Sequence, residues 1–330
     1  MTTTTRFQAL PASRSTALEA RLGPPRALRY AHGANPVEDL PAHVRAASSI
    51  RRQGERLIIA QDDVSALALL DPATGATLPI LLPAAPDGKR VFDDVRGNKK
   101  LKLDLEASIL LPDGRFVAFG SGSSPHREKI VTVGAGERPF AQVMAGTDFY
   151  ARLRQVASER GARLNVEGAV VQGGWLRLLQ RGTAKRGFVA WNAILDVSLP
   201  AFVRWLDGRA SMPEVQRVME VDLGAIDGVP LGFTDAAVTV DGRLAFIACA
   251  EDTADAVDDG PVLGCCFGWI DAHDVAASTT VVLDANGRPT TLKLEGIEAR
   301  PGSSVLFDVV ADMDRGEEAA QIAALSVTEG

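Results

Sequence analysis

Residues 233–253 read FTDAAVTVDGRLAFIACAEDT. An acid, Asp235, stands at the start of an apolar run, and the turn residues Asp241 and Gly242 separate this run from a second one. An acidic loop follows from Glu251. Two apolar runs joined by an Asp-Gly turn indicate a β-hairpin. The stretch therefore predicts two antiparallel strands with acids at the same end.

The same order recurs along the chain at a spacing of roughly 60 residues. Each copy has an acid or a serine at the start of a first strand, then a glycine turn, then a second apolar strand. The residues at this position are Ser48, Glu106, Glu167, Asp235 and Glu295. Third strands are expected at 66–70, 129–133, 188–194, 266–270 and 321–327. Four strands in a unit of this size are typical of a β-propeller blade, so we predict an all-β, five-bladed β-propeller, with six blades as the alternative.

Three further features complete the predicted architecture. Residues 27–32 are expected to supply the strand that closes the last blade, because the final repeat ends near Gly330 without a fourth strand. Helical patterns at 149–160 and 201–206 are placed in connections between blades. We expect a single domain over residues 26–330, preceded by a partly disordered extension over residues 1–25.

The composition limits the classes of partner. Hydrophobic residues make up 46% of the 330 positions, which is enough for a sizeable core. The net charge of -7 argues against nucleic acid or an anionic membrane as partner, because both attract basic proteins. No run reaches the roughly 18 apolar residues of a membrane helix, and no secretory signal is visible, so we expect a cytoplasmic location.

The three cysteines are Cys249, Cys265 and Cys266. Three cysteines, two of them adjacent, do not form a disulfide framework, so we expect small buried hydrophobic side chains and a reducing compartment.

The predicted site lies at one mouth of the central channel. The innermost strand of each blade runs along the channel, so the acids at the strand starts should form a ring there, with Ser48 completing it. The loops after the second strands return to the same rim, because the first two strands are antiparallel. These loops should bring further polar and charged residues to the ring: Asp62, Ser121, Ser123, His126, Arg127, Arg181, Glu251 and Asp252. Lys102, just before the strand that carries Glu106, should join them.

A ring of acids is costly unless its charges are paired, protonated or bound to a cation. We therefore expect a divalent cation, Ca²⁺ or Mg²⁺, held by Glu106, Glu167, Asp235 and Glu295, since converging oxygen ligands suit these metals better than zinc. The alternative is that each acid only caps backbone amides of a neighbouring blade. A P-loop, a dinucleotide fingerprint and a nucleophile elbow are missing, so no nucleotide or organic cofactor is expected.

Four blocks of sequence carry a resemblance to a known group. They are Lys100-x-Lys102-x-Asp104-x-Glu106-Ala107, residues 119–123 with Arg127, residues 165–168, and residues 223–253. These blocks resemble a bacterial family of uncharacterised propeller-like proteins, which is similar to the group described as "esterase-like activity of phytase". The resemblance covers the chain from about residue 44 and implies a propeller fold. The name of the larger group implies hydrolysis of an ester or phosphoester, but it assigns no catalytic residues.

Three functions follow as hypotheses. The first is a metal-supported ester or phosphoester hydrolase that binds a small polar or anionic ligand. In it Glu106, Glu167 and Asp235 activate water or hold the metal, and Arg127, Arg181 and Lys102 bind the anion. The second is a propeller that binds a small molecule or a protein without catalysis. The third is a lyase or isomerase with an acid/base pair such as Glu167 and His126.

Overall fold

The computed structural model of the chain describes residues 5–135, 140–182, 187–252 and 260–330. Within these residues the structure is almost entirely β, with two α-helices and three short 3₁₀ helices. Twenty of the strands form five sets of four, and each set is a meander in which neighbours in sequence pair antiparallel, except that the last set borrows a strand from the N-terminus.

The first two sets are separate four-stranded sheets. One contains β4 (Ala47–Gln53), β5 (Arg56–Gln61), β6 (Ala66–Leu70) and β7 (Thr77–Leu81). The other contains β8 (Leu105–Leu110), β9 (Phe116–Gly120), β10 (Lys129–Val133) and β11 (Ala141–Ala145).

The other three sets join into one 14-stranded sheet. They are β12 (Val166–Gln172), β13 (Trp175–Gln180), β14 (Ala193–Ser198) and β15 (Val215–Asp222), then β18 (Gly232–Val238), β19 (Leu244–Glu251), β20 (Val262–Ile270) and β21 (Ala277–Leu283), then β22 (Lys293–Ala299), β23 (Leu306–Asp312) and β24 (Gln321–Glu329) with β2 (Leu18–Leu22). A small hairpin, β16 (Ala225–Ile226) and β17 (Val229–Pro230), stands apart.

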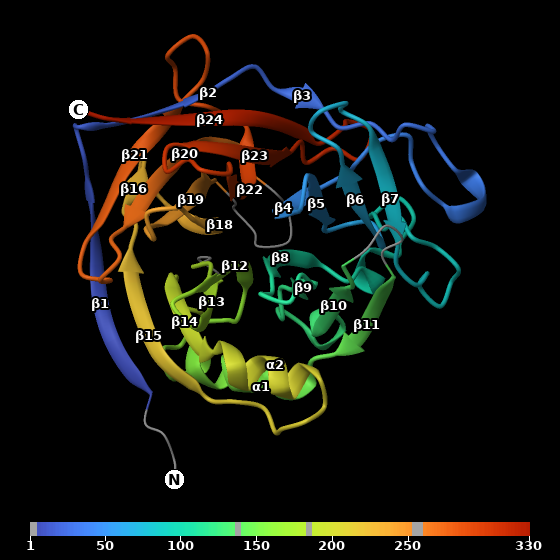
Figure 1. Ribbon diagram of the computed structural model, residues 1–330, viewed down its shortest axis with the longest axis horizontal. Helices are drawn as coiled ribbons and strands as arrows, with labels where there is room; N and C mark the ends of the chain where they lie inside the picture. Colours follow the sequence, from blue (N-terminus) through green and yellow to red (C-terminus); the bar gives the residue numbers. More distant parts are fainter. Residues whose placement is uncertain (1–4, 136–139, 183–186, 253–259) are drawn as a thin grey trace.

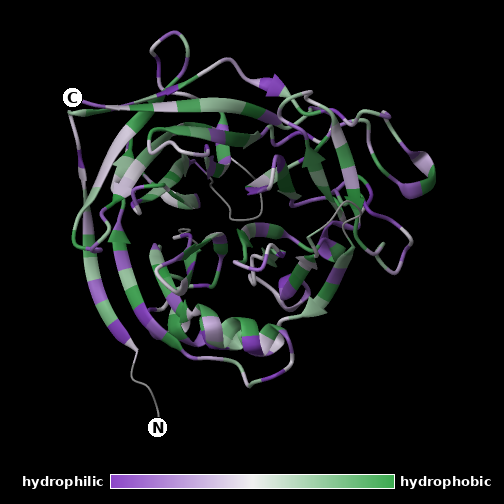
Figure 2. Ribbon diagram, viewed as in Figure 1, coloured by the Kyte–Doolittle hydropathy of each residue, from purple (hydrophilic) through white to green (hydrophobic). Residues whose placement is uncertain are grey.

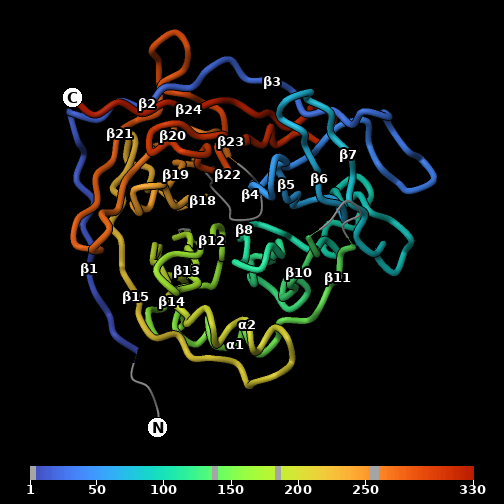
Figure 3. The backbone as a smooth tube through the Cα atoms, viewed as in Figure 1, coloured from blue at the N-terminus to red at the C-terminus, as the bar shows by residue number. Residues whose placement is uncertain are grey.

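The first strands of the sets surround a common axis. β4 contacts β8, β8 contacts β12, β12 contacts β18, β18 contacts β22, and β22 contacts β4 again. Figure 1 shows the sets arranged around this axis, and Figure 3 traces the chain around it in sequence order. The fold is therefore propeller-like. Figure 2 shows apolar residues along the strands, where neighbouring sets pack on each other.

The N-terminal segment, which the sequence sets aside as an extension, pairs with the sheet from residue 6. β1 (Arg6–Arg14) runs parallel to β15 over Arg6–Pro11 and then to β21 over Ala12–Arg14. β2 pairs antiparallel with β24 and is the strand that completes the last set. The prediction that residues 27–32 supply this strand is wrong in its bounds, since β2 supplies it and the predicted segment pairs with the last set only at Ala27, in β3 (Arg26–Ala27), and at Leu28. Pairing of β2 removes the exposed edge of β24.

Two other element predictions need correction. α1 (Thr147–Glu159) connects β11 to β12 as expected, but α2 (Leu199–Leu206) lies within a set, between β14 and β15. The third strand predicted at 188–194 is β14, at 193–198, because residues before it form a loop held by the Asn192 side chain, which bonds the backbone of Gly182 and Leu231. Neither described helix is long and apolar enough to span a bilayer.

The cysteine prediction is also wrong in part. Cys249 and Cys265 form a disulfide, and Cys266 is free and buried. The two bonded residues lie directly opposite each other on the antiparallel strands β19 and β20. The register of this strand pair, which the residue spacing does not reveal, brings them together. The expected reducing compartment loses its main support.

Glycines on the inner strands allow the sets to approach closely. A Cβ on Gly168 of β12 would lie 2.9 Å from the Cα of Asp235, and one on Gly296 of β22 would lie 3.0 Å from the backbone nitrogen of Ile50. The neighbours are backbone atoms of the adjacent inner strand, which cannot rotate away as a side chain does.

Gly168→Ala is therefore expected to lower the free energy of unfolding by about 1–3 kcal/mol, because the methyl group must push two inner strands apart. Gly134→Ala is the matched control, since its Cβ would meet nothing within 4 Å. Chemical denaturation of both variants measures the difference. Equal stability of the two would show that the ring relaxes freely at Gly168.

Candidate functional site

A β-bulge near the start of each inner strand positions the site residues. In four of the strands the register skips Ser48, Glu106, Glu167 or Glu295. In the fifth, β18, the register skips Thr234, so Asp235 lies one residue further along. A bulge leaves its extra residue unpaired and redirects its side chain. The equivalent of the acids in β18 is therefore Thr234.

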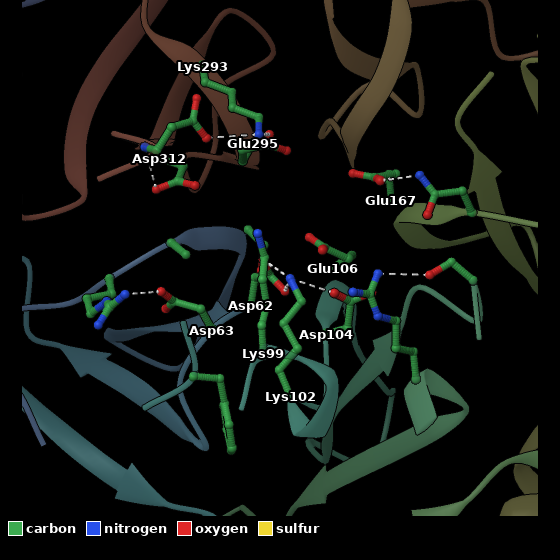
Figure 4. Close-up of a pocket in the computed structure, with 18 of the residues that line it drawn as sticks. Asp62, Asp63, Lys99, Lys102, Asp104, Glu106, Glu167, Lys293, Glu295 and Asp312 are labelled. Carbon is green, nitrogen blue, oxygen red and sulfur yellow. Dashed lines mark hydrogen bonds and ion pairs between the residues drawn. The ribbon is translucent and has the colours of Figure 1, made fainter. Parts of the chain in front are cut away.

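A cavity of about 630 Å³ opens at this end of the inner strands. Ten of the residues predicted for the site line it: Ser48, Asp62, Lys102, Glu106, Ser123, Arg127, Glu167, Arg181, Glu251 and Glu295. They come from all five sets, as the prediction of a shared rim requires. Figure 4 shows many of these charged groups pointing into the same space.

Four predicted site residues are not in the cavity lining. His126 is exposed on a 3₁₀ helix (Pro125–Arg127), and Asp252 is exposed in the loop after β19. Ser121 is buried, and its hydroxyl forms hydrogen bonds with Asp104 and Ser123. Asp235 is fully buried on the axis, away from the cavity lining. The prediction of Asp235 as a cavity acid is wrong because a shift of one residue on a strand turns a side chain to the other face.

Asp235 forms a buried ion pair with Arg51 that fills the axis. Two guanidinium nitrogens of Arg51 lie 2.7 and 3.0 Å from the two carboxylate oxygens of Asp235. The same guanidinium donates to backbone carbonyls of the inner strands β4, β8, β12 and β22, so together with Asp235 on β18 it touches all five. Burial raises the pKa of Asp235 to about 6, although Arg51 opposes the shift.

The first charged cluster in the cavity joins the first two sets. The ammonium of Lys102 lies 2.6 Å from both carboxylate oxygens of Asp62 and 2.8 Å from Oδ1 of Asp104. Arg127 approaches the other oxygen of Asp104 at 3.0 Å. Burial raises the pKa of Asp62 to about 7 against the effect of Lys102. For Asp104 the two cations outweigh burial, and its pKa falls below the usual range.

Glu106 stands beside this cluster without a partner. Within the described residues its carboxyl group makes no hydrogen bond or ion pair, and Figure 4 shows it between Asp104 and Glu167. Burial, together with the charges of Asp62, Glu167 and Asp104, raises its pKa well above the usual range. The surroundings of Glu106 therefore favour its neutral form.

The second cluster joins the other three sets around Arg181 and Lys293. Arg181 contacts Glu251 at 2.6 Å and Glu167 at 3.4 Å, and Lys293 contacts Glu251 at 2.9 Å and Glu295 at 3.4 Å. Burial raises the pKa of Glu295 well above its usual range despite both cations. The two cations lower the pKa of Glu251 below its usual value, against burial.

The rim loops also bring in Asp63, Asp312 and Asp314, and Lys293 lies beside Glu295, as the repeat predicts; sequence reasoning missed Arg45, Lys99, Lys100, Asp104 and Arg163. Asp104 had a visible signal, because it stands between Lys102 and Glu106 in one block of alternating charged residues. Arg45 had none. It reaches Asp63 at 2.7 Å and Asp93 at 3.5 Å from a segment that the repeat does not include.

Solved structures with a similar overall arrangement are distant in sequence. One is a glutaminyl cyclase from Myxococcus xanthus, with 11% identity, 99% of this chain and 100% of that chain covered, and a TM-score of 0.47. Another is the PQQ-bound aldose sugar dehydrogenase from Streptomyces coelicolor, with 12% identity, coverage of 96% and 100%, and a TM-score of 0.48. A mannose phosphorylase from Leishmania mexicana gives 12% identity, coverage of 92% and 88%, and a TM-score of 0.47.

No curated protein matches the chain by sequence. A protein family does match it, over residues 43–327, which include every cavity residue named above. Its description is "Family of unknown function (DUF6929)". This chain is a member of that family.

Proposed function

We propose that the protein is a five-bladed β-propeller whose mouth cavity binds a small, polar, anionic molecule, and that it hydrolyses an ester or phosphoester bond with the support of Ca²⁺ or Mg²⁺. The blade count is supported by the five inner strands that contact one another around the axis. The class of bond is proposed from the name of the phytase-related group, to which the family resembled by the Lys100–Ala107 and 223–253 blocks is similar.

One observation carries the proposal of a cation. Carboxylate oxygens of Asp62, Asp104 and Glu106 all lie within 4.8 Å of one another at the wall of the cavity. Oδ1 of Asp104 is buried and contacts the ammonium of Lys102 at 2.8 Å, whereas the Glu106 carboxyl has no hydrogen-bond or ion-pair partner in the described part of the chain. Three converging carboxylates are the ligands that Ca²⁺ and Mg²⁺ prefer. The cation ligands proposed here replace the predicted set, from which only Glu106 remains.

The ammonium of Lys102 occupies the position between Asp62 and Asp104 that the proposed divalent cation would take. Its ammonium bridges Asp62 and Asp104 at hydrogen-bond distance, so a divalent ion must displace it. The four-carbon stem of lysine lets the ammonium turn toward the cavity when this happens. Lys102 then becomes a free cation beside the bound anion, which is the role that the sequence predicted for it.

The other cavity residues supply the remaining parts of a hydrolytic site. A cation held by Asp62, Asp104 and Glu106 would supply Lewis-acid chemistry, which polarises an ester and lowers the pKa of water. Glu167, held by Asn165 at 2.5 Å, is the carboxyl group next to Glu106 and is placed to accept a proton from water. Arg127 and Arg181 line the cavity, and their guanidinium groups would stabilise negative charge that develops on the substrate.

The test compares wild type with Glu106→Gln, a substitution that removes one ligand charge and preserves shape. Wild type is expected to bind Ca²⁺ or Mg²⁺ in calorimetry and to hydrolyse a chromogenic phosphoester or carboxylic ester in a reaction that a chelator stops. Glu106→Gln is expected to bind the cation at least about tenfold more weakly, since a carboxylate–cation contact contributes more than a neutral amide. Asp252→Asn, outside the cavity lining, is the matched control. Unchanged cation binding by Glu106→Gln rejects the site.

The raised pKa of Glu106 beside the ionised Asp104 supports a second candidate, an acid/base lyase or isomerase. In this case Glu106 donates the proton, and it replaces His126, which lies outside the cavity lining. Activity that survives a chelator but is lost in Glu106→Gln would select this candidate over the hydrolase. Ligand binding without turnover would select the non-catalytic propeller.

A further inference from the structure

One side of the cavity mouth is basic. This basic wall consists of Lys99, Lys100, Ser123, Ser124, Arg127 and Arg163. Asp93 and Asp94 line the cavity beside it, and Asp94 pairs with Lys99. It is built by the segment that leads into β8, the loop after β9 and the segment that leads into β12. Elsewhere the mouth mixes acids, among them Glu251, Glu295 and Asp314, with the cations Arg181 and Lys293 that pair with them.

Two cations of the basic wall have no acidic partner among the described residues. Lys100 is exposed and makes neither an ion pair nor a hydrogen bond there. Arg163 is exposed, and its only side-chain hydrogen bond goes to the carbonyl of Ser123 at 2.6 Å. These two positive charges are therefore available for a ligand.

The basic wall also offers hydroxyl groups and a link to the carboxylate cluster. Ser124 precedes the short 3₁₀ helix, but its hydroxyl makes no capping hydrogen bond. Arg127 lies 3.0 Å from the hydroxyl of Ser123 and 3.0 Å from Oδ2 of Asp104. A group bound on the wall therefore lies next to the proposed cation ligands.

We propose that the basic wall binds the phosphoryl group of a phosphorylated small molecule, so that the substrate is a phosphoester rather than a carboxylic ester. Two guanidinium groups, an ammonium and a free hydroxyl match the several oxygens and the double charge of a phosphoryl group better than the two oxygens of a carboxylate. This inference rests on the proposed function, because it assigns the substrate class of the same cavity.

Inorganic phosphate is the probe, titrated into the metal-free full-length protein by calorimetry. Wild type is expected to bind phosphate saturably and acetate much more weakly. Removing both unpaired cations, with Lys100→Ala and Arg163→Ala together, is expected to weaken phosphate binding at least about tenfold, because each lost contact is a charge-assisted hydrogen bond. The matched control removes Lys89 and Arg209, two exposed basic residues outside the cavity lining.

Three results overturn the inference: no saturable phosphate binding by wild type, equal binding by the wall variant and the control, or acetate binding as tight as phosphate. Phosphate binding by Glu106→Gln separates the two proposals. One outcome is that Glu106→Gln and wild type bind phosphate equally, the wall variant binds it more weakly, and wild type binds no divalent cation. In that case the phosphate site stands and the metal-supported hydrolase is rejected. If wild type binds the cation but the wall variant binds phosphate as tightly as wild type does, the hydrolase proposal stands and the basic wall is rejected as the phosphate site.

Discussion

Replacing Arg51 by alanine is expected to lower the free energy of unfolding by about 3–5 kcal/mol, because the variant leaves the carboxylate of Asp235 buried without its partner. Asp235 is fully buried and Arg51 is nearly so. The loss extends beyond one ion pair. The guanidinium also bonds carbonyl groups of four inner strands, and these acceptors lose their donor at the same time.

Urea denaturation of Arg51→Ala measures this loss, and a double variant isolates its cause. Arg51→Met with Asp235→Asn removes both charges and keeps most of the side-chain volume, so it is expected to recover part of the stability. Arg209→Ala is the surface control, since its ion pair with Asp207 is exposed on the arginine side and should contribute less than about 1 kcal/mol. A loss in Arg51→Ala no larger than in Arg209→Ala would show that the pair does not hold the ring together.

The axial pair also shows where sequence reasoning stops. The repeated hairpins predict the inner strands well, because alternating apolar residues and glycine turns are local signals. The position of Asp235 depends on which residue each bulge skips, and a bulge depends on the partner strand. An alignment on the turn glycines cannot detect a difference of one residue. Arg51, which the repeat does not single out, is the residue of β4 that occupies the axis.

In the cavity, too, the features set by local sequence were predictable and those set by contacts between distant segments were not. Glu106, Glu167 and Glu295 were predictable, because the repeat carries each of them to the same height on its inner strand. The pairing of charges was not. Lys102 meets Asp62 across two sets, and Arg181 meets Glu251 across two others. Such contacts depend on how neighbouring sets are oriented, and no spacing within one set encodes that.

Cation affinity is expected to rise steeply with pH, because binding must remove protons from two of the proposed ligands. Burial raises the pKa of Asp62 to about 7 and that of Glu106 well above its usual range. Below these values both carboxyls are protonated and a cation competes with two protons, so the affinity should rise by up to about 100-fold per pH unit. Above them the affinity levels off. Calorimetry with Ca²⁺ at several pH values between 5 and 9, in buffers of different ionisation enthalpy, measures both affinity and proton release.

Two variants test which groups produce this dependence. Asp62→Asn removes one of the two protons, so the slope should fall to about tenfold per pH unit, with weaker binding throughout.

Lys102→Met should act in two ways. The steep region should move to higher pH, because Lys102 favours the ionised form of Asp62, and the limiting affinity at high pH should rise at least about tenfold, because the competing ammonium is gone. Lys99→Met, at the rim and paired with Asp94, should change neither. An affinity that is independent of pH in wild type would mean that the cation binds elsewhere, since no ion can use Asp62 and Glu106 together without displacing their protons.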